Sequence, residues 1–192
     1  MAHKYLKTLF TETIRKTQEE LGSREGYQRM ENGPVANGEL SSREINFISQ
    51  RDSFYMATIT EDNWPYTQHR GGPIGFVKIL SPTQIGFSDY SGNRQYISVG
   101  NIKTNNRASI IMVDYPNRRR LKIVGELEAV SEKSELANKI KTDNYKATVE
   151  RFLVMNIIGF DWNCPQHITP RFTLDELAAA SIEKSKHKRG EL

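Results

Sequence analysis

The sequence contains a single cysteine, Cys164, among its 192 residues. One cysteine excludes a disulfide within the chain, so we expect a reducing, cytoplasmic location. No apolar run approaches the roughly 18 residues of a membrane-spanning helix. The first residues, "MAHKYLKTLF", also lack the apolar stretch and the cleavage site of a secretory signal. We therefore expect no contact with a membrane.

Metal-binding and common catalytic motifs are missing as well. Four histidines and one cysteine are scattered along the chain without the spacing of metal ligands. There is no Walker loop, no G-x-G-x-x-G and no G-x-S-x-G. The segment "DWNCPQH", residues 161–167, allows a nucleophilic Cys164–His167 pair, but an aromatic loop that covers a flat ligand explains it equally well.

The chain has little excess charge outside two short stretches. Its net charge is +4, of which Arg118, Arg119 and Arg120 supply +3 and the last eleven residues +2. Since the remainder is nearly neutral, the sequence does not predict a general nucleic-acid-binding surface. A nucleic-acid binder that uses "NRRR" and the basic tail would show a steep salt dependence of binding.

The length fits one domain with an extension at the N-terminus. We expect the extension to cover residues 1–40, with a helix, "FTETIRKTQEELG", that ends at Gly22 and a loop, "RMENGPVANGELSS". The domain then covers residues 41–192. Ser41 or Ser42 is expected to cap a helix over "REINFISQR", and Ser131 or Ser134 one over "SEKSELANKIK". A final helix begins at Thr173, with Glu176 in capping-box position.

Alternating and β-branched segments predict six short strands between these helices. They are "SFYMATIT", "PYTQHR" with "FVKIL" resuming it after "GGPIG", "IGFSDY", "RASIIMVDY", "LKIVGELEAV" and "VERFLVMNIIGFDW". The length of the last segment also allows a helix. Connections of hairpin length are too short for parallel crossovers, so the pattern predicts an antiparallel barrel or sandwich.

Two strand ends carry residues suited to a phosphate. The first is the run Ser88, Asp89, Ser91, Gly92, Asn93, Arg94 and Gln95, where a strand passes through a turn directly into a helix. Asn93 is an ordinary helix N-cap there, but free N–H groups beside an arginine also bind phosphate. The second is "HRGGPIG", in which glycines such as Gly71 let another group approach the backbone closely and Arg70 supplies a cation. Two such sites on neighbouring strands match a phosphomonoester.

The three consecutive arginines are expected to differ in role. Alternation places Arg120 on the face opposite Leu121 and Ile123, so its side chain should point out of the barrel. Arg118 is interpreted as part of a charged turn that aids solubility.

These residues make the chain resemble the pyridoxamine 5′-phosphate oxidase-related family of FMN-binding split barrels. The resemblance is carried by "YMATITEDNWPYTQHRGGPIGFVKIL", "IGFSDYSGNRQYISVGNIKTNNRASIIMVDY" and "NRRRLKIVGELEAV", which cover about residues 54 to 130. It implies a mainly β (α+β) fold, a six-stranded antiparallel split β-barrel with flanking helices. It also implies a homodimer with FMN at the subunit interface.

The resemblance further assigns site residues. It implies that Arg70 and the turn and helix start at Arg94 and Gln95 hold the FMN phosphate. Positions matching Ser88 and Asp89 line the ribityl chain and ring, and Arg120 reaches the flavin from the partner subunit. Trp162 and Arg171 are similar to a closing aromatic residue and a closing cation.

Three departures from the family pattern argue against oxidation of vitamin B6. Gln95 stands where pyridoxamine phosphate oxidases usually carry lysine, and the "RGGPIG" insertion replaces a compact strand segment. The C-terminal Arg/His motif that holds the pyridoxal substrate is not recognisable. We therefore expect an oxidoreductase that passes a hydride between FMN and a small organic substrate or a nicotinamide. The alternatives left open are a non-catalytic flavin store, sensor or carrier, and a deazaflavin in place of FMN.

Overall fold

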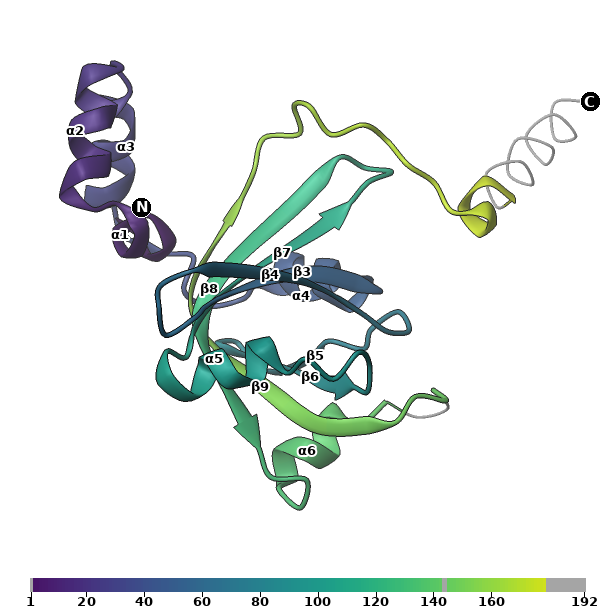
Figure 1. Cartoon of the computed structure of the whole chain (residues 1–192). Helices are drawn as coiled ribbons and strands as arrows, with labels where there is room; N and C mark the ends of the chain where they lie inside the picture. Colours follow the sequence, from purple (N-terminus) through teal and green to yellow (C-terminus); the bar gives the residue numbers. More distant parts are fainter. Residues whose placement is uncertain (1, 143–144, 179–192) are drawn as a thin grey trace, which may run out of the picture.

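A computed structural model describes residues 2–142 and 145–178 of the chain. Its centre is an antiparallel sheet of seven strands in the order β4-β3-β7-β8-β9-β6-β5 (Figure 1). The strands are β3 (Ser53–Ile59), β4 (Pro65–Gly71), β5 (Lys78–Ser81), β6 (Gln84–Tyr90), β7 (Arg107–Asp114), β8 (Arg119–Val130) and β9 (Val149–Trp162). The helices are α1 (Lys4–Leu9), α2 (Glu12–Glu20), α3 (Arg24–Asn32), α4 (Ser42–Ser49), α5 (Ile97–Thr104) and α6 (Glu135–Ile140). A two-stranded parallel sheet joins β1 (Ala2–His3) to β2 (Val35–Ala36).

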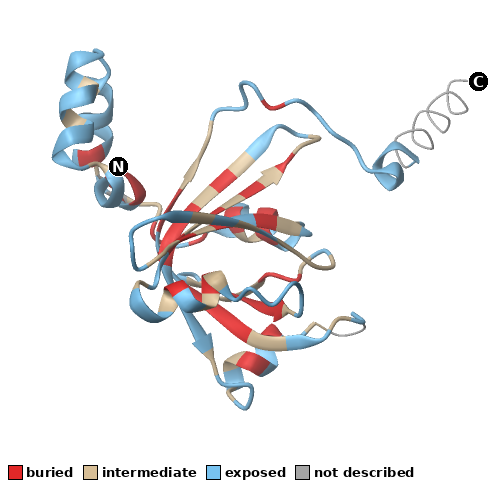
Figure 2. Ribbon diagram, viewed as in Figure 1, coloured by how far each residue is buried: buried red, intermediate tan, exposed pale blue. Residues whose placement is uncertain are grey.

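The sheet curls around one apolar core, because alternate residues of its strands face inward. On β7 the buried residues alternate strictly, and Ile110 and Met112 are fully buried. The ring of Phe54 on β3 lies 4.9 Å from that of Phe87 on β6, although these strands are not neighbours in the sheet. Figure 2 shows that buried segments occur on strands throughout the sheet. The half of the sheet that contains β3 therefore packs face to face with the half that contains β6, as the predicted antiparallel architecture requires.

The prediction of six strands was wrong, because "FVKIL" does not resume the strand before it. β4 and β5 lie at the two opposite edges of the sheet. Between them, Gly75 adopts a φ of 77°, and its N–H donates to the carbonyl oxygen of Arg51. This left-handed residue lets the chain leave one edge and cross to the other. Phe76 then packs against Phe54 in the core.

Three predicted helix starts are confirmed. Ser41 and Glu44 form a capping box at the start of α4, and the Ser134 hydroxyl accepts a hydrogen bond from the N–H of Ala137 in α6. The N–H of Thr173 donates to Glu176 Oε2 at 2.7 Å, while Thr173 Oγ1 accepts from the N–H of Glu176 at 3.2 Å. We predicted this helix over "TLDELAAASIEKSKHK", residues 173–188, and its part beyond residue 178 lies outside the described residues.

The N-terminal segment contains more helix than its sequence pattern predicts. α3 covers Arg24–Asn32, so the first residues of the predicted loop are helical. The carboxylate of Glu31 is only 4% exposed and pairs with Arg15 on α2 and with Arg24. The pair with Arg15 joins α2 to α3, whereas Arg24 lies on α3 itself, and the two helices extend away from the sheet side by side (Figure 1). Within residues 2–142 and 145–178, no helix is long and apolar enough to cross a membrane.

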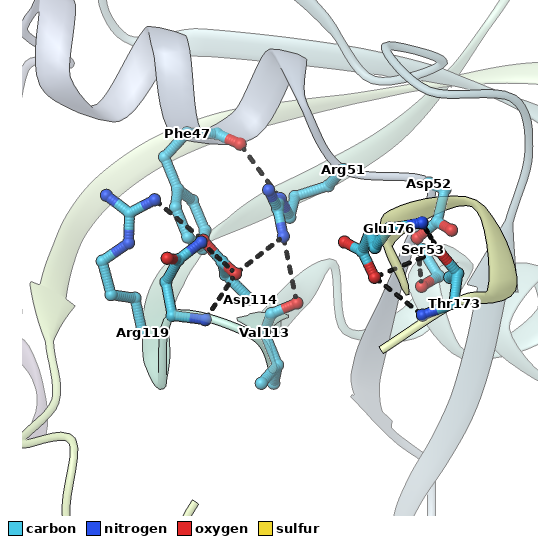
Figure 3. Close-up of polar contacts among 10 residues, drawn as sticks. Phe47, Arg51, Asp52, Ser53, Val113, Asp114, Arg119, Thr173 and Glu176 are labelled. Atoms are coloured by element: carbon cyan, nitrogen blue, oxygen red, sulfur yellow. Dashed lines mark hydrogen bonds and ion pairs between the residues drawn. The ribbon is translucent and has the colours of Figure 1, made fainter. Parts of the chain in front are cut away.

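A buried carboxylate joins α4 to the hairpin between β7 and β8 (Figure 3). Asp114 is 2% exposed and accepts hydrogen bonds from Arg119 Nη2 at 2.8 Å and from Asn117. Arg51, which follows α4, lies 3.8 Å from the same carboxylate. Burial raises the pKa of Asp114, but the hydrogen bonds from Arg119 and Asn117 outweigh burial and lower the pKa below its ordinary 3.8. Arg119 is thus a structural residue.

We expect Asp114→Asn to lower the free energy of unfolding at pH 7 by about 3 kcal/mol, because the largely buried Arg51 and the half-exposed Arg119 lose the buried charge that they pair with. A lowered folded-state pKa means that the carboxylate stabilises the protein above pH 3.8 and that this stability disappears as the pH falls through the lowered value. Urea unfolding at pH 7 and at about pH 3 should therefore show a smaller difference between mutant and wild type in acid. Asp62→Asn, at an exposed turn, is the control. Equal stability of D114N and wild type at pH 7 would contradict the prediction.

Candidate anion-binding site

Three arginines surround a hollow between β4, β6, β9 and the start of α5. Its volume is about 180 Å³. It is lined by Tyr66, Gln68, Arg70, Asp89, Tyr90, Gly92, Asn93, Arg94, Gln95, Tyr96, Ile97, Ser98, Val99, Glu150 and Arg151. The volume is below the roughly 300–1,000 Å³ of pockets that enclose a small molecule. The α5 hollow, as we call it, therefore fits a compact group rather than a whole ligand.

Asp89 holds two of these arginines together. It is 4% exposed and forms ion pairs with Arg70 Nη1 and, at 2.6 Å, with Arg151 Nη1. Arg70 lies opposite Phe54 in the register of β3 and β4, and Arg151 lies opposite Asp89 in that of β6 and β9. Residues opposite one another share a face, so all three side chains point inward. The cluster thus connects β4, at one edge of the sheet, with the half that contains β6 and β9.

The third arginine lies on a turn with left-handed backbone. Arg94 and Tyr96 have φ angles of 59° and 54°. Arg94 Nε donates to Tyr96 Oη at 3.0 Å, which in turn lies 3.3 Å from Glu150 Oε1. The hydrogen bond with Tyr96 raises the pKa of Arg94. Burial raises the pKa of Glu150, but a hydrogen bond from Ser91 and then the charge of Arg151 outweigh it and lower the pKa. Both groups are therefore charged near neutral pH.

The first turn of α5 opens onto the hollow without a side-chain cap. We predicted a helix that begins directly after Asn93, but α5 begins at Ile97 and its N-cap is Tyr96. The reason is local, because Asn93 Oδ1 accepts a hydrogen bond from the N–H of Gln95 and closes a turn of its own. Ile97, Ser98 and Val99 line the hollow. The first N–H groups of a helix lack partners within it and attract anions.

The structure brings together five of the eleven site residues predicted from the sequence. Arg70, Asp89, Asn93, Arg94 and Gln95 line the α5 hollow. Ser91 lies beside it and hydrogen-bonds with Glu150. Gly71 ends β4 and does not line the hollow. Ser88 is the neighbour of Asp89 in β6, so its side chain faces the other side of the strand. There it lies opposite Phe152, which belongs to a small apolar cluster with Ala137 and Ile140 of α6.

Arg120 and Arg171 line a second hollow. Leu121 and Ile123 are fully buried and Arg120 lies on the other face of β8, as predicted. This second hollow, about 220 Å³ in volume, is lined by Ile111, Val113, Tyr115, Arg120, His167, Ile168, Thr169 and Arg171. The guanidinium of Arg171 lies 4.9 Å from the ring centroid of Tyr115. Burial, followed by the neighbouring Tyr55, raises the pKa of Tyr115.

Trp162 lies at α4 rather than in either hollow. Its indole Nε1 donates to Glu44 Oε1 at 2.7 Å, and Arg43 covers its ring at 4.4 Å. Its ring also meets Phe47 edge-on. These contacts fasten α4 to the end of β9. Cys164 is exposed, and the described residues contain no cluster of side chains suited to a metal ion.

Arg151 and Glu150 are site residues that the sequence patterns missed. Arg151 shares its face of β9 with Leu153 and Met155, both fully buried. A charged residue at an inward position of an apolar strand was a signal available in the sequence. It was hidden because "VERFLVMNIIGFDW" could be assigned to a helix as well as to a strand.

In this protein of antiparallel-sheet architecture, the α5 hollow combines three guanidinium groups, two carboxylates and an uncapped helix start, a set of groups suited to an anion. The profile of the family described as pyridoxamine 5′-phosphate oxidase matches residues 44–157, more than half of the chain. The chain belongs to this family.

Solved structures of the same fold come from several bacteria. A candidate pyridoxamine 5′-phosphate oxidase from Lactobacillus delbrueckii has 19% identity and a TM-score of 0.50, over 66% of this chain and 97% of that chain. HupZ of Group A Streptococcus has 14% identity and a TM-score of 0.52, over 69% and 100%. An FMN-binding protein from Syntrophomonas wolfei has 15% identity and a TM-score of 0.50, over 80% and 96%. No curated protein matches significantly. At these identities the likeness establishes the fold alone.

Proposed function

We propose that the chain binds FMN with its phosphate in the α5 hollow and that it is a flavin-dependent oxidoreductase. The observation that carries the proposal is the convergence of Arg70, Arg94 and Arg151 on a phosphate-sized hollow beside an uncapped helix start. Membership of the pyridoxamine 5′-phosphate oxidase family supports it. The FMN-binding protein from Syntrophomonas wolfei shares the fold, which supports the same cofactor.

The residues of the hollow fit a phosphomonoester in charge and in hydrogen bonding. Its three arginines exceed its two carboxylates by one positive charge, and a phosphomonoester carries about −1.5 to −2 near neutral pH. Arg70 Nε is buried and, within the described part of the chain, has no hydrogen-bond partner. Such a donor is costly unless a ligand satisfies it. The N–H groups of Ile97, Ser98 and Val99 would supply further donors.

The rest of FMN must lie outside this hollow, because about 180 Å³ does not hold a tricyclic ring. We propose that a second copy of the chain covers the ring with the face that bears Arg120 and Arg171. The buried Nε of Arg120 also lacks a partner among the described residues. Two cations beside the ring would stabilise negative charge that develops on it.

Bound FMN would supply the electron-transfer chemistry, while the chain supplies position and electrostatics. Arg70, Arg94 and Arg151 would hold the phosphate, and Arg120 with Arg171 would provide positive charge. No acid–base pair among the described residues is needed, since a hydride passes directly between a donor and a flavin. The rival function is a flavin carrier or store without turnover.

The visible spectrum of the freshly purified protein, with its mass on a sizing column, tests this proposal. We expect a yellow protein with one FMN per chain and the mass of a dimer. Anaerobic mixing with NADPH and NADH should bleach the flavin rapidly if the protein is an oxidoreductase. Unchanged flavin would favour the carrier, and a colourless protein that does not bind added FMN would refute the proposal.

A further inference from the structure

The N-terminal extension contains a cavity of its own, formed by α1, α2 and α3, which lie together away from the sheet (Figure 1). Its volume is about 530 Å³, within the roughly 300–1,000 Å³ of pockets that hold a small molecule. All the side chains that line it are polar or charged: Lys7, Arg15, Arg24, Gln28, Glu31 and Asn32. Most small-molecule pockets are mainly apolar, so this lining points to a charged ligand. We call it the N-terminal cavity.

The N-terminal cavity has an excess of positive charge. One cation comes from each helix: Lys7 from α1, Arg15 from α2 and Arg24 from α3. Among the described residues that line the cavity, Glu31 is the only carboxylate. Burial raises the pKa of Glu31, but hydrogen bonds from Arg15 and then Arg24 outweigh burial and lower the pKa below its ordinary 4.5. Glu31 is therefore ionised near neutral pH, and the cations still exceed it by two charges.

Other carboxylates of the hairpin do not balance this excess. Glu12 Oε1 lies 2.9 Å from Lys16 Nζ, and Glu25 Oε1 lies 3.1 Å from Arg29 Nη2, so both are paired with cations outside the cavity. The two glutamates that end α2 do not line the cavity. The positive charge inside it is thus left to the solvent or to a ligand.

Much of the hydrogen-bonding capacity of the three cations is unused. Arg15 Nε and Nη2 both donate to Glu31 Oε1, at 3.3 and 2.9 Å. Arg24 Nη1 donates to Gln18 Oε1 at 3.0 Å and pairs with Glu31 Oε2. A guanidinium donates from all three of its nitrogens, so Nη1 of Arg15 and both Nε and Nη2 of Arg24 remain available. Lys7 is exposed and, within the part of the chain that the structure describes, has no ion pair.

We propose that the N-terminal cavity binds a small anion of the diphosphate class through Lys7, Arg15 and Arg24. Arginine forks pair bidentately with phosphoryl oxygens, and lysine binds them as a point charge. The cavity has about three times the volume of the α5 hollow, which we assign to a single phosphate, so it has room for a longer anion. Such an anion would also relieve repulsion, because Glu31 holds the like charges of Arg15 and Arg24 close together.

This inference goes beyond the proposed function. Of the described residues, none that lines the N-terminal cavity also lines the α5 hollow or the second hollow. All of them precede residue 44, where the match to the family profile begins. Failure of the protein to bind FMN would refute the proposed function and leave the anion site standing.

Calorimetric titration with inorganic pyrophosphate at pH 7 tests the anion site. The proteins are the wild type, Lys7→Gln, Arg15→Gln and the control Lys16→Gln, whose exposed lysine lies on α2 but does not line the cavity. We expect K7Q and R15Q each to weaken pyrophosphate binding about 10-fold or more, the effect of losing one hydrogen bond between charged groups. K16Q should bind as the wild type does. Absence of binding by the wild type, or equal affinities of K7Q and K16Q, would refute the site.

A variant of the other anion site shows where pyrophosphate binds. Arg70→Gln, in the α5 hollow, should leave pyrophosphate binding unchanged, because Arg70 does not line the N-terminal cavity. Binding that is lost in R70Q but kept in K7Q would place the anion in the α5 hollow and overturn this inference.

Two further ligands define the class of anion. Succinate, a dicarboxylate, should bind at least 10-fold more weakly than pyrophosphate, and equal affinity would refute the diphosphate class. ADP carries the same diphosphate on a nucleoside. Tighter binding of ADP than of pyrophosphate would identify a nucleotide as the source of the diphosphate, and weaker binding would identify the free anion.

Hydrogen exchange separates recognition from folding. A ligand that binds only the folded hairpin stabilises it, so pyrophosphate should slow amide exchange in α2 and α3 of the wild type. Without the ligand, K7Q should exchange as the wild type does, because Lys7 has no ion pair to lose among the described residues. Equal protection by pyrophosphate in K7Q and in the wild type would overturn the role of Lys7.

Discussion

Replacing Arg70 by glutamine is expected to weaken FMN binding about 100-fold, which corresponds to the loss of roughly 3 kcal/mol of charge-assisted hydrogen bonding. Of the three arginines, Arg70 is expected to contribute most to FMN affinity. Its side chain is 12% exposed, its Nη1 pairs with Asp89, and its buried Nε has no protein partner among the described residues. A phosphate in the α5 hollow would satisfy Nε, so the mutation removes both a charge and a preformed donor. Fluorescence titration with FMN measures the effect.

The same mutation removes one partner of a buried ion pair and will also affect stability. Removal of one charge of such a pair costs about 3–5 kcal/mol when the other charge is left alone, but Asp89 keeps Arg151. We therefore expect R70Q to fold with a lower urea midpoint. Riboflavin affinity is the internal control, because it should change far less than FMN affinity. Arg118→Gln, in the exposed turn between β7 and β8, is the matched surface control. If R70Q retained the FMN affinity of the wild type, phosphate binding in this hollow would be refuted.

Much of the fold is predictable because its signals are local. β7 alternates in burial along its length, as β8 does from Arg120 to Ile123. Ser41, Ser134 and Thr173 cap helices through neighbours two or three residues away. The outward direction of Arg120 follows from the same alternation.

Features that depend on distant contacts were not predictable from pattern. β4 and β5 are separated by a few residues in sequence but occupy opposite edges, and the packing of Phe76 on Phe54 helps to stabilise the crossing. α3 is stabilised by the pairing of Glu31 with Arg15, sixteen residues earlier in the chain. Arg151 joins the site through its register opposite Asp89, a partner 62 residues away. Ser88 and Trp162 have suitable chemistry but face other neighbours.

Gly125 is where a single methyl group should damage the sheet most. The pairing of β8 with β9 shifts register between Val124 and Gly125, so Ile158 is an extra residue in β9. This bulge brings the backbone of β9 close to Gly125. A Cβ built on Gly125 would lie 2.2 Å from the carbonyl oxygen of Asn156. The backbone of β9 cannot move aside as a flexible side chain can. The pair of β8 and β9 also lies at the centre of the sheet, so a shift there would disturb both neighbouring strands.

We therefore expect Gly125→Ala to lower the free energy of unfolding by about 4 kcal/mol or more, at the upper end of single substitutions. Urea unfolding, followed by far-UV circular dichroism, measures the loss. Gly100→Ala is the matched control, because a Cβ there meets nothing within 4 Å and the residue lies inside α5. It should leave stability unchanged or raise it by up to about 1 kcal/mol. If G125A were as stable as G100A, the close approach of the β9 backbone to Gly125 would be refuted. If G125A lost stability but kept its FMN affinity when folded, the strain would be confined to the bulge opposite Gly125 and would not reach Arg151 near the start of β9.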